Sequence, residues 1–158
     1  MITCYLGLGS NLNHPKIQIQ TAVDALRQLP NSSLKALSKL YQSAPAGVLT
    51  EQPMYYNAVA CLETNLSPHE LLKHCNLIET AQNRVRLKRL DARTIDIDIL
   101  LYGTEIIQTS DLTIPHPRCH LRDFVLVPLL DLWPEAHLPD GTNLKACLEA
   151  LEVSYVLM

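Results

Sequence analysis

The chain has 158 residues, of which 47% are hydrophobic and 18% charged, and its formal net charge at pH 7 is −3. This much apolar material can fill a core, which argues against a disordered chain. The negative net charge argues against a chain built as a whole to bind polyanions. The longest apolar runs are far shorter than the roughly 20 residues of a membrane-spanning helix. No basic leader precedes the first apolar segment, so we expect a cytoplasmic protein without a signal peptide or membrane anchor.

The cysteines are odd in number and widely spaced, and no two form a Cys-x-x-Cys pair. This spacing makes a structural zinc site or a disulfide framework improbable. We expect reduced, partly buried thiols at all five positions, Cys4, Cys61, Cys75, Cys119 and Cys147.

The first third of the chain begins with an apolar run that predicts a strand over Ile2–Leu8. The sequence Gly7–Asn11 predicts a tight turn at its end, with Ser10 or Asn11 capping the next helix. The turn has neither the Gly-Lys-Ser/Thr of a P-loop nor a third glycine of a dinucleotide fingerprint, so we interpret it as structural. Helical periodicity covers His14–Leu29, and a second strand is expected over Leu34–Tyr41.

The rest of the chain alternates long loops with regular elements. Three breakers (two prolines and a glycine) make Ser43–Pro53 a long loop. Ser67 followed by proline starts a helix that runs to about Gln82, and a polar, basic loop follows. Gly103 turns the strongest strand into a hairpin partner at Glu105–Gln108. The expected strands and helices of this part are Tyr55–Leu62, Pro68–Gln82, Ile95–Tyr102, Arg122–Leu130 and a last helix near Thr142.

This order of elements predicts one α+β domain over residues 1–158. Strand, helix, strand, strand, helix, strand is the split β-α-β plan of the ferredoxin-like fold. We expect an antiparallel sheet with helices on one face, extra C-terminal elements and long mobile loops.

The most informative motif is the acidic strand Thr94–Leu100. Asp96 and Asp98 point to the same face because side chains alternate along a strand, and the isoleucines between and beside them bury the other face. Two ionised carboxylates on one face repel each other unless a cation joins them, and magnesium suits such oxygen ligands. The alternative is a solvent-facing strand that carries two acids.

A basic segment lies directly before this strand. Five of the chain's 13 Lys and Arg fall within ten residues, namely Arg84, Arg86, Lys88, Arg89 and Arg93. Arginine forks bind phosphate oxygens, so a basic loop next to a metal-binding strand favours phosphoryl chemistry. A solvated basic loop and a nucleic-acid patch are the alternatives.

Two further motifs are weaker by themselves. Prolines on both sides of His116 restrict its backbone, so the imidazole can face a phosphate; a solvated loop histidine is the alternative. Tyr55 and Asn57 share a strand face, where a ring can stack on a flat heterocycle and an amide can bind its edge. Phe124, the only phenylalanine, is a candidate opposite wall. Ordinary core and edge residues explain the second motif equally well.

Taken together, short motifs spread over nearly the whole chain resemble the 6-hydroxymethyl-7,8-dihydropterin pyrophosphokinase family of folate synthesis. Their order and spacing make the resemblance specific. They are Leu8–Leu12, Gln52–Asn57, Arg84–Arg86, Arg93–Ile99, Pro115–Arg118 and Arg122–Leu126.

The resemblance implies an enzyme that transfers diphosphate from ATP to the hydroxymethyl group of the pterin and releases AMP. It implies that the pterin stacks between Tyr55 and Phe124 while Asn57 binds its edge. The implied pterin-binding residues are Ser43, Ala44, Ala46, Tyr55, Asn57 and Phe124.

The resemblance also implies ATP as co-substrate and a Mg²⁺ cofactor, with two ions held by Asp96 and Asp98. Arg84, Arg93 and Asp98 are the implied catalytic residues. A monomer without nucleic-acid or membrane partners is expected. The implied ATP-binding residues are Glu79, Arg84, Arg86, Arg93, Ile99, Thr113, His116, Arg118 and Arg122.

The chain departs from the family pattern at two places. Family members often carry Trp-Gly-Pro before the Arg-Thr step, whereas this chain has Leu90–Ala92 in a loop that is one residue shorter. Some members carry an arginine at the position of Asp111.

Two other classes of function compete with this interpretation. Ferredoxin-like sheets often bind RNA, but that class favours exposed aromatics and a basic total charge, and only 5% of these residues are aromatic. A metal-dependent phosphodiesterase would use the same aspartate pair without the Tyr55 and Asn57 pocket.

Overall fold

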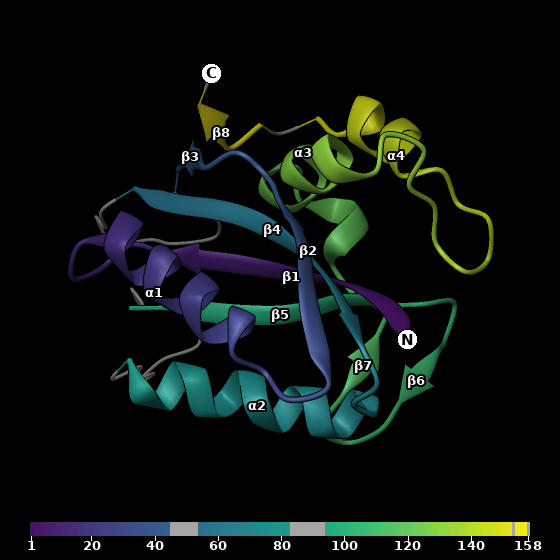
Figure 1. Cartoon of the computed structure of the whole chain (residues 1–158). Helices are drawn as coiled ribbons and strands as arrows, with labels where there is room; N and C mark the ends of the chain where they lie inside the picture. Colours follow the sequence, from purple (N-terminus) through teal and green to yellow (C-terminus); the bar gives the residue numbers. More distant parts are fainter. Residues whose placement is uncertain (45–53, 83–93, 153, 158) are drawn as a thin grey trace.

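The computed structural model describes residues 1–44, 54–82, 94–152 and 154–157. Within these ranges the chain forms strands, α-helices and one short 3-10 helix (Figure 1). In chain order they are β1 Ile2–Ser10, α1 Pro15–Arg27, β2 Ser32–Leu37, β3 Tyr41–Ser43, β4 Tyr55–Thr64, α2 Pro68–Ala81, β5 Asp96–Tyr102, β6 Ile107–Gln108, β7 Thr113–Ile114, η1 Cys119–Leu121, α3 Asp123–Leu132, α4 Leu144–Ala150 and β8 Val156–Leu157.

The main sheet is antiparallel and has the order β5-β1-β4-β3-β8, with β2 also paired to β4. β1 pairs with β4 along its whole length and with β5 on its other side. The four strands of the split β-α-β plan therefore take the order β5-β1-β4-β2, which confirms the predicted ferredoxin-like architecture.

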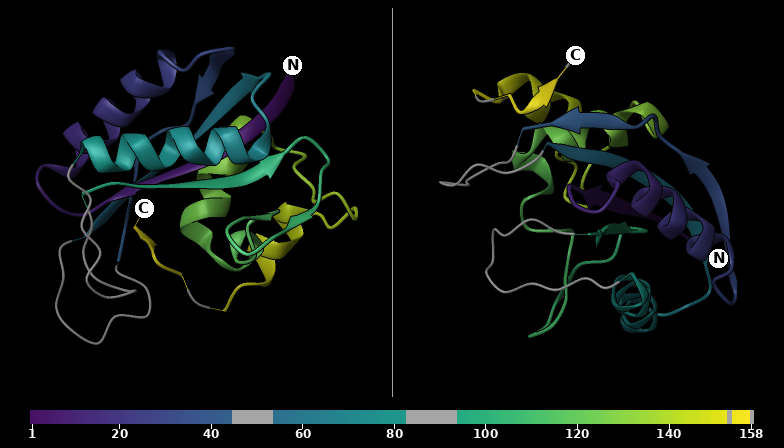
Figure 2. Two further views of the ribbon diagram at one scale, coloured as in Figure 1. Left: turned by 90° about the horizontal axis from the view of Figure 1, so that it is seen from below. Right: turned by 90° about the vertical axis from the view of Figure 1, so that its left-hand side faces the viewer.

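The helices form layers on both faces of this sheet (Figure 2). α1 and α2 cover one face, where they bury alternate residues of the central strands, such as Leu6, Ala60 and Ile97. The C-terminal helices α3 and α4 cover part of the other face, where Val59 and Leu100 join a second apolar cluster. Helices α1 and α2 thus pack on one face of the sheet, and the other face is left open beside α3. No helix of the described residues is long and apolar enough to cross a membrane.

The start of α2 shows why the sequence forms a helix there. Ser67 Oγ accepts a hydrogen bond from Glu70 N at 3.2 Å, and Glu70 Oε1 accepts one from Ser67 N at 2.9 Å. This reciprocal cap satisfies two donors that the first helical turn leaves free. The cap predicted at Ser67 is confirmed, and it aims Leu71 and Cys75 into the core.

The predicted glycine turn after the first strand is wrong. Gly7 and Gly9 lie inside β1, where they pair with Val59 and Asn57 of β4. Neither of the two candidate caps serves α1, because His14 occupies the cap position and makes no side-chain cap hydrogen bond. Strand pairing on both sides of β1 outweighs the local preference of glycine for turns.

The predicted hairpin between the acidic strand and Glu105–Gln108 is also wrong. β6 pairs with β7 instead, in a separate two-stranded sheet. Thr109 N donates to Leu112 O at 2.9 Å, and Thr109 Oγ1 donates to Asp111 Oδ1 at 2.8 Å. These local bonds close a turn inside the segment, so it folds back on itself.

One short strand prediction is revised as well. The expected strand Leu34–Tyr41 is divided into β2 and β3 by residues 38–40. Ser38 N donates to Val59 O at 2.9 Å, and Val59 N donates to Ser38 Oγ at 2.8 Å. The break therefore stays attached to β4, and β3 continues beyond it in the same antiparallel pairing with β4.

Two leucines of α2 differ in exposure and so test which side of the helix faces the core. Leu71 is 0% exposed, whereas Leu77 on the same helix is 55% exposed. We expect Leu71→Ala to lower the free energy of unfolding by about 2–5 kcal/mol through lost transfer energy and a cavity. Leu77→Ala should change it by less than about 0.5 kcal/mol. Urea denaturation followed by circular dichroism measures both, and equal losses would contradict the placement of α2.

Candidate active site

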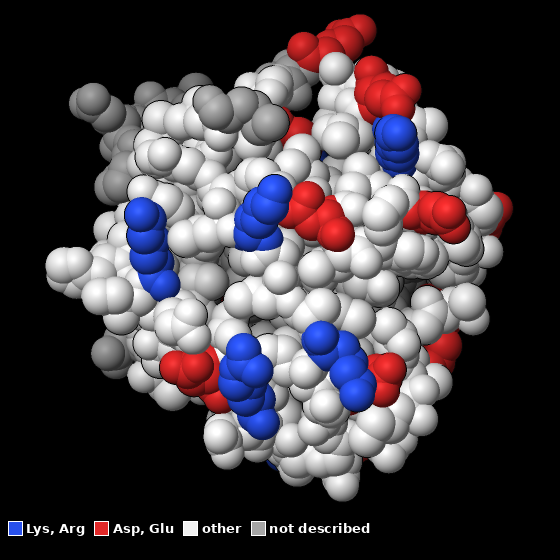
Figure 3. Space-filling view, turned by 45° about the horizontal axis from the view of Figure 1, so that its top comes forward, with Lys and Arg blue, Asp and Glu red and all other residues white. Residues whose placement is uncertain are grey.

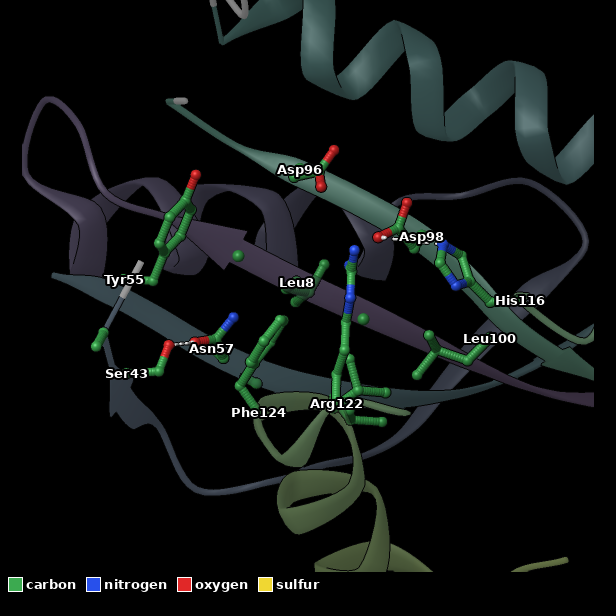
Figure 4. A pocket seen from close by; sticks show the side chains of 16 residues that line it. Leu8, Ser43, Tyr55, Asn57, Asp96, Asp98, Leu100, His116, Arg122 and Phe124 are labelled. Carbon is green, nitrogen blue, oxygen red and sulfur yellow. Dashed lines mark hydrogen bonds and ion pairs between the residues drawn. The ribbon is translucent and has the colours of Figure 1, made fainter. Parts of the chain in front are cut away.

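A cavity opens on the uncovered face of the sheet, beside the start of α3 (Figure 4). Strands β1, β3, β4 and β5 contribute its floor and sides, and α3 with the segment before it contributes the remaining wall. The lining residues are Gly7, Leu8, Gly9, Ser43, Ala44, Tyr55, Asn57, Ala58, Val59, Asp96, Asp98, Leu100, His116, Arg122, Phe124 and Val125.

The floor of the cavity is β1, and its two glycines leave the floor low. A Cβ atom added at Gly9 would lie 3.2 Å from Asn57 Nδ2, which is closer than most real contacts of this kind. One added at Gly7 would meet Leu100 at 3.4 Å, an ordinary contact. Sequence reasoning missed both glycines as lining residues. The signal for them is a pair of glycines two residues apart in a strand, which lines one face with bare backbone.

One end of the cavity is aromatic. Tyr55 at the start of β4 and Phe124 in the first turn of α3 both line it, and Asn57 lies between them on the floor (Figure 4). Ser43 Oγ donates to Asn57 Oδ1 at 2.7 Å. With its oxygen bound from behind, the Asn57 amide presents Nδ2 to the cavity (Figure 4). This end can accept a flat ring with a hydrogen-bond acceptor at its edge.

The other end of the cavity is charged. Asp96 and Asp98 project from β5 on the open face, while Ile97 between them is buried under the helices (Figure 4). His116 Nε2 lies 3.9 Å from Asp98 Oδ2. Arg122 extends from the start of α3 toward these groups, and its guanidinium lies over the Phe124 ring, 5.5 Å from the centroid.

The imidazole of His116 is oriented by its own backbone neighbours. His116 N donates to Leu100 O at 3.0 Å, and Arg118 N donates to His116 Nδ1 at 3.2 Å. An acceptor role for Nδ1 leaves the proton of the neutral ring on Nε2, facing Asp98. Burial lowers the pKa of His116 below its usual 6.5, and the positive charges of Arg122 and Arg118 act in the same direction against the attraction of Asp96.

The aspartate pair is the part of this site that can hold a metal ion. Its carboxylate oxygens are hard ligands, and the Asp98 side chain is 39% exposed, so it is open to a ligand in the cavity. Within the described ranges, no three His, Cys, Asp or Glu side chains come close enough to form a complete protein metal site. Such a pair fits an ion that takes its other ligands from phosphate and water, as Mg²⁺ does.

Several residues expected near ATP lie elsewhere. Glu79 is buried, and its Oε2 accepts a hydrogen bond from Ile97 N of β5 at 2.8 Å. Ile99 is buried in the core of the covered face. Thr113 and Arg118 are exposed and do not line the cavity. The predicted site residues Ala46, Arg84, Arg86 and Arg93, and the segment Leu90–Ala92, lie outside the described residues.

Figure 3 shows the charged side chains on one face of the described residues. Among the described residues there, single Lys and Arg side chains are interspersed with Asp and Glu (Figure 3).

Known proteins share this sequence and fold. The model of the family described as 7,8-dihydro-6-hydroxymethylpterin-pyrophosphokinase (HPPK) matches residues 5–134, which is most of the chain. The chain belongs to this family.

Relatives that match over most of their own length agree with this membership. The 2-amino-4-hydroxy-6-hydroxymethyldihydropteridine pyrophosphokinase of Haemophilus influenzae is 51% identical over 141 residues, which cover 89% of this chain and 88% of that protein. The enzyme of the same name from Pseudomonas aeruginosa is 47% identical over 146 residues, covering 92% and 90%.

Solved HPPK structures show the same fold at low identity. An HPPK-DHPS structure in complex with substrates matches with a TM-score of 0.72 at 13% identity over 94% of this chain. Wild-type HPPK-DHPS of Plasmodium falciparum with SDX-DHP matches with a TM-score of 0.70 at 16% identity. The chain spans 43% of each of these HPPK-DHPS chains, and at this identity they show the fold alone.

His116 supplies a pH-dependent test of this HPPK-family site. We expect its imidazole to titrate below pH 6.5, because burial and the neighbouring arginines disfavour the charged ring. Since the folded-state pKa is the lower one, the stability linked to this group is present above about pH 6.5 and is lost as the pH falls through the folded value. NMR titration, assigned with His116→Gln, measures the midpoint, and a value at or above 6.5 would contradict the expected effect of burial and of the neighbouring arginines.

Proposed function

We propose that this chain transfers the terminal diphosphate of ATP to the hydroxymethyl oxygen of 6-hydroxymethyl-7,8-dihydropterin and releases AMP. Membership of the HPPK family supports an ATP-dependent diphosphotransferase of folate biosynthesis. One observation supports the placement of the two substrates: a single cavity has an aromatic end with a fixed amide and a charged end with an aspartate pair. The first end suits a pterin and the second suits phosphates.

The pterin is proposed to lie between the rings of Tyr55 and Phe124. Both rings border the aromatic end, and a flat heterocycle between them would bury apolar surface on both of its faces. Asn57 Nδ2 then donates to an acceptor on the edge of the pterin, because Ser43 already occupies Asn57 Oδ1. Ser43 and Ala44 close the side of this end, and we propose that Ala46 continues the same wall.

The triphosphate of ATP is proposed to lie at the charged end. Asp96 and Asp98 would hold Mg²⁺, with two ions as the expected number, and the bound metal would neutralise phosphate charge. His116 Nε2–H and the Arg122 guanidinium face the same space and donate to phosphate oxygens. Arg84, Arg86 and Arg93 are proposed to add positive charge around the diphosphate, with Arg84 and Arg93 acting in catalysis.

In the proposed reaction the hydroxymethyl oxygen forms a bond to the β-phosphorus of ATP. The bond from that phosphorus to the oxygen that bridges to the α-phosphorus breaks, and AMP leaves with the bridging oxygen. The hydroxyl proton passes to Asp98 or to water. The chain contributes mainly by holding the two reactants in line and by donating to the phosphate oxygens.

The side chains of the remaining residues expected near ATP do not line the cavity. Ile99 can reach the nucleotide only through its backbone, since its side chain is in the core. Thr113, Arg118 and Glu79 do not line the cavity, so we propose that they act at its margin or by supporting β5.

We also propose that residues 1–158 form one domain that acts as a monomer in the cytoplasm, without a nucleic-acid partner. All five cysteines are free thiols, which accords with a reducing compartment.

The aspartate pair provides the direct test of this function. We expect Asp96→Asn and Asp98→Asn each to lower pterin-dependent AMP formation by roughly two orders of magnitude or more, because the neutral amide loses the charge that holds the metal. Asp24→Asn, at an exposed position of α1, is the matched control and should retain full activity. AMP is measured by chromatography with ATP, Mg²⁺ and the pterin alcohol. Near-normal turnover in either variant, or phosphodiester cleavage in place of AMP formation, would overturn the proposal.

The glycine floor tests the position of the pterin. Gly9→Ala places a methyl group against Asn57 Nδ2 and displaces the proposed donor. We expect the KM for the pterin to rise about tenfold, the equivalent of one hydrogen bond of about 1.4 kcal/mol. Gly7→Ala, two residues earlier on the same face, has Leu100 as its nearest neighbour at an ordinary contact distance and should give a much smaller rise. Steady-state kinetics measure both, and equal effects would contradict a pterin edge bound at Asn57.

A further inference from the structure

A buried carboxylate outside the cavity binds the C-terminal segment of the chain. Asp123, the first residue of α3, is 4% exposed. Its Oδ2 accepts three hydrogen bonds, from Ser154 Oγ at 3.1 Å, Tyr155 N at 2.8 Å and Val156 N at 2.9 Å. Bonds from backbone N–H groups to a carboxylate are among the stronger ones in proteins, and a buried carboxylate is costly without them. We call Asp123 with Ser154–Val156 the C-terminal clamp.

The clamp holds the strand that forms one side of the cavity. β8 pairs with β3, with Val156 opposite Ser43. Ala44 N donates to Tyr155 O at 2.9 Å, which extends the pairing by one residue. Figure 1 shows β8 beside β3 at the edge of the sheet, next to α3. The outer edge of β3 is thus covered by a segment whose own position depends on Asp123.

The same clamp also supports the aromatic wall. The Tyr155 ring meets the Phe124 ring edge to face, with centroids 6.2 Å apart. Phe124 directly follows Asp123 in the chain, so one end of the clamp fixes the helix start that carries the ring. The other end fixes Ser43, whose Oγ orients the Asn57 amide at 2.7 Å.

We infer that Asp123 is a positioning residue of the pterin end of the cavity. Through Ser154–Val156 it sets the distance between the Phe124 wall and the strand that carries Ser43, and hence the direction of the Asn57 amide. This inference rests on the proposed pterin site. Asp123 itself does not line the cavity, so it acts on the ligand only through these neighbours.

A purely structural role makes a different prediction. An acidic residue in the first turn of a helix stabilises that helix through its dipole wherever the helix lies. Loss of that effect would lower stability or the active fraction, which lowers kcat and leaves both KM values unchanged. Loss of positioning raises the KM for the pterin selectively, because the triphosphate is proposed to bind at the other end of the cavity.

The test compares two carboxylates of α3. Asp123→Asn retains the shape of the side chain but removes its charge, so the bonds to Tyr155 and Val156 weaken. We expect the KM for the pterin to rise roughly tenfold or more, with the KM for ATP within about twofold of the wild-type value. Asp131→Asn is the matched control, because exposed Asp131 accepts a hydrogen bond from Tyr41 of β3 at 2.5 Å but lies away from the cavity. It should leave both KM values unchanged.

A truncated chain that ends at Glu152 removes the other half of the clamp. It should raise the KM for the pterin at least as much as Asp123→Asn, and adding Asp123→Asn to it should change nothing further, since both act through one contact. Thermal melting and circular dichroism establish that each variant is folded. If the truncated chain does not fold, the comparison of Asp123→Asn with Asp131→Asn decides alone.

The outcomes separate this inference from the proposed function. The proposed function stands if the wild-type chain forms pterin-dependent AMP. The inference about Asp123 is then overturned if Asp123→Asn leaves the KM for the pterin unchanged, or raises the KM for ATP by the same factor. Equal KM increases in Asp123→Asn and Asp131→Asn overturn it as well, because they indicate general loosening of α3. Wild-type chain that forms no AMP overturns the proposed function, and the clamp inference with it.

Discussion

The alternation of side chains along β1, β4 and β5 is the constraint on which the rest of this structure depends. On one face Leu6, Ala60 and Ile97 lie under α1 and α2. On the other face, from neighbouring positions of the same strands, come Asn57 and Asp96. A shift of one residue in register would exchange the two faces, placing carboxylates under the helices and removing the core. The burial of aliphatic side chains therefore holds the polar groups of the cavity in place.

The open face gains its chemistry from elements that approach it from outside the central strands. The segment before α3 brings His116 to within 3.9 Å of Asp98, and α3 adds Phe124 and Arg122. The C-terminal strand then closes the edge beside β3. Two walls built from the second half of the chain thus stand on a floor built mainly from the first strands. This arrangement separates an aromatic end from a charged end. A reaction that joins a substituent of a flat ring to a polyphosphate requires both kinds of binding surface side by side.

Much of the fold could be predicted because the responsible interactions are local. Strand alternation around Asp96 and the cap at Ser67 depend on residues within a few positions of each other, and both agree with the structure. Gly7 and Gly9 favour a turn by residue type, but the two neighbouring strands hold them extended, and a local pattern does not show that pairing. The segment after β5 pairs with β7 for a related reason: the bonds around Thr109 close a turn that residue types alone do not reveal.

The sequence by itself determined which side chains share a face, because the period of a strand or helix follows from backbone geometry. It thereby placed Tyr55 with Asn57 and Asp96 with Asp98, and the motifs around them indicated the family. Only the tertiary structure decided which of these pairs meet, and how. The bond from Ser43 to Asn57 and the clamp from Asp123 to the C-terminal segment join residues 14 and more than 30 positions apart. Such contacts depend on how whole layers pack, which no local pattern specifies.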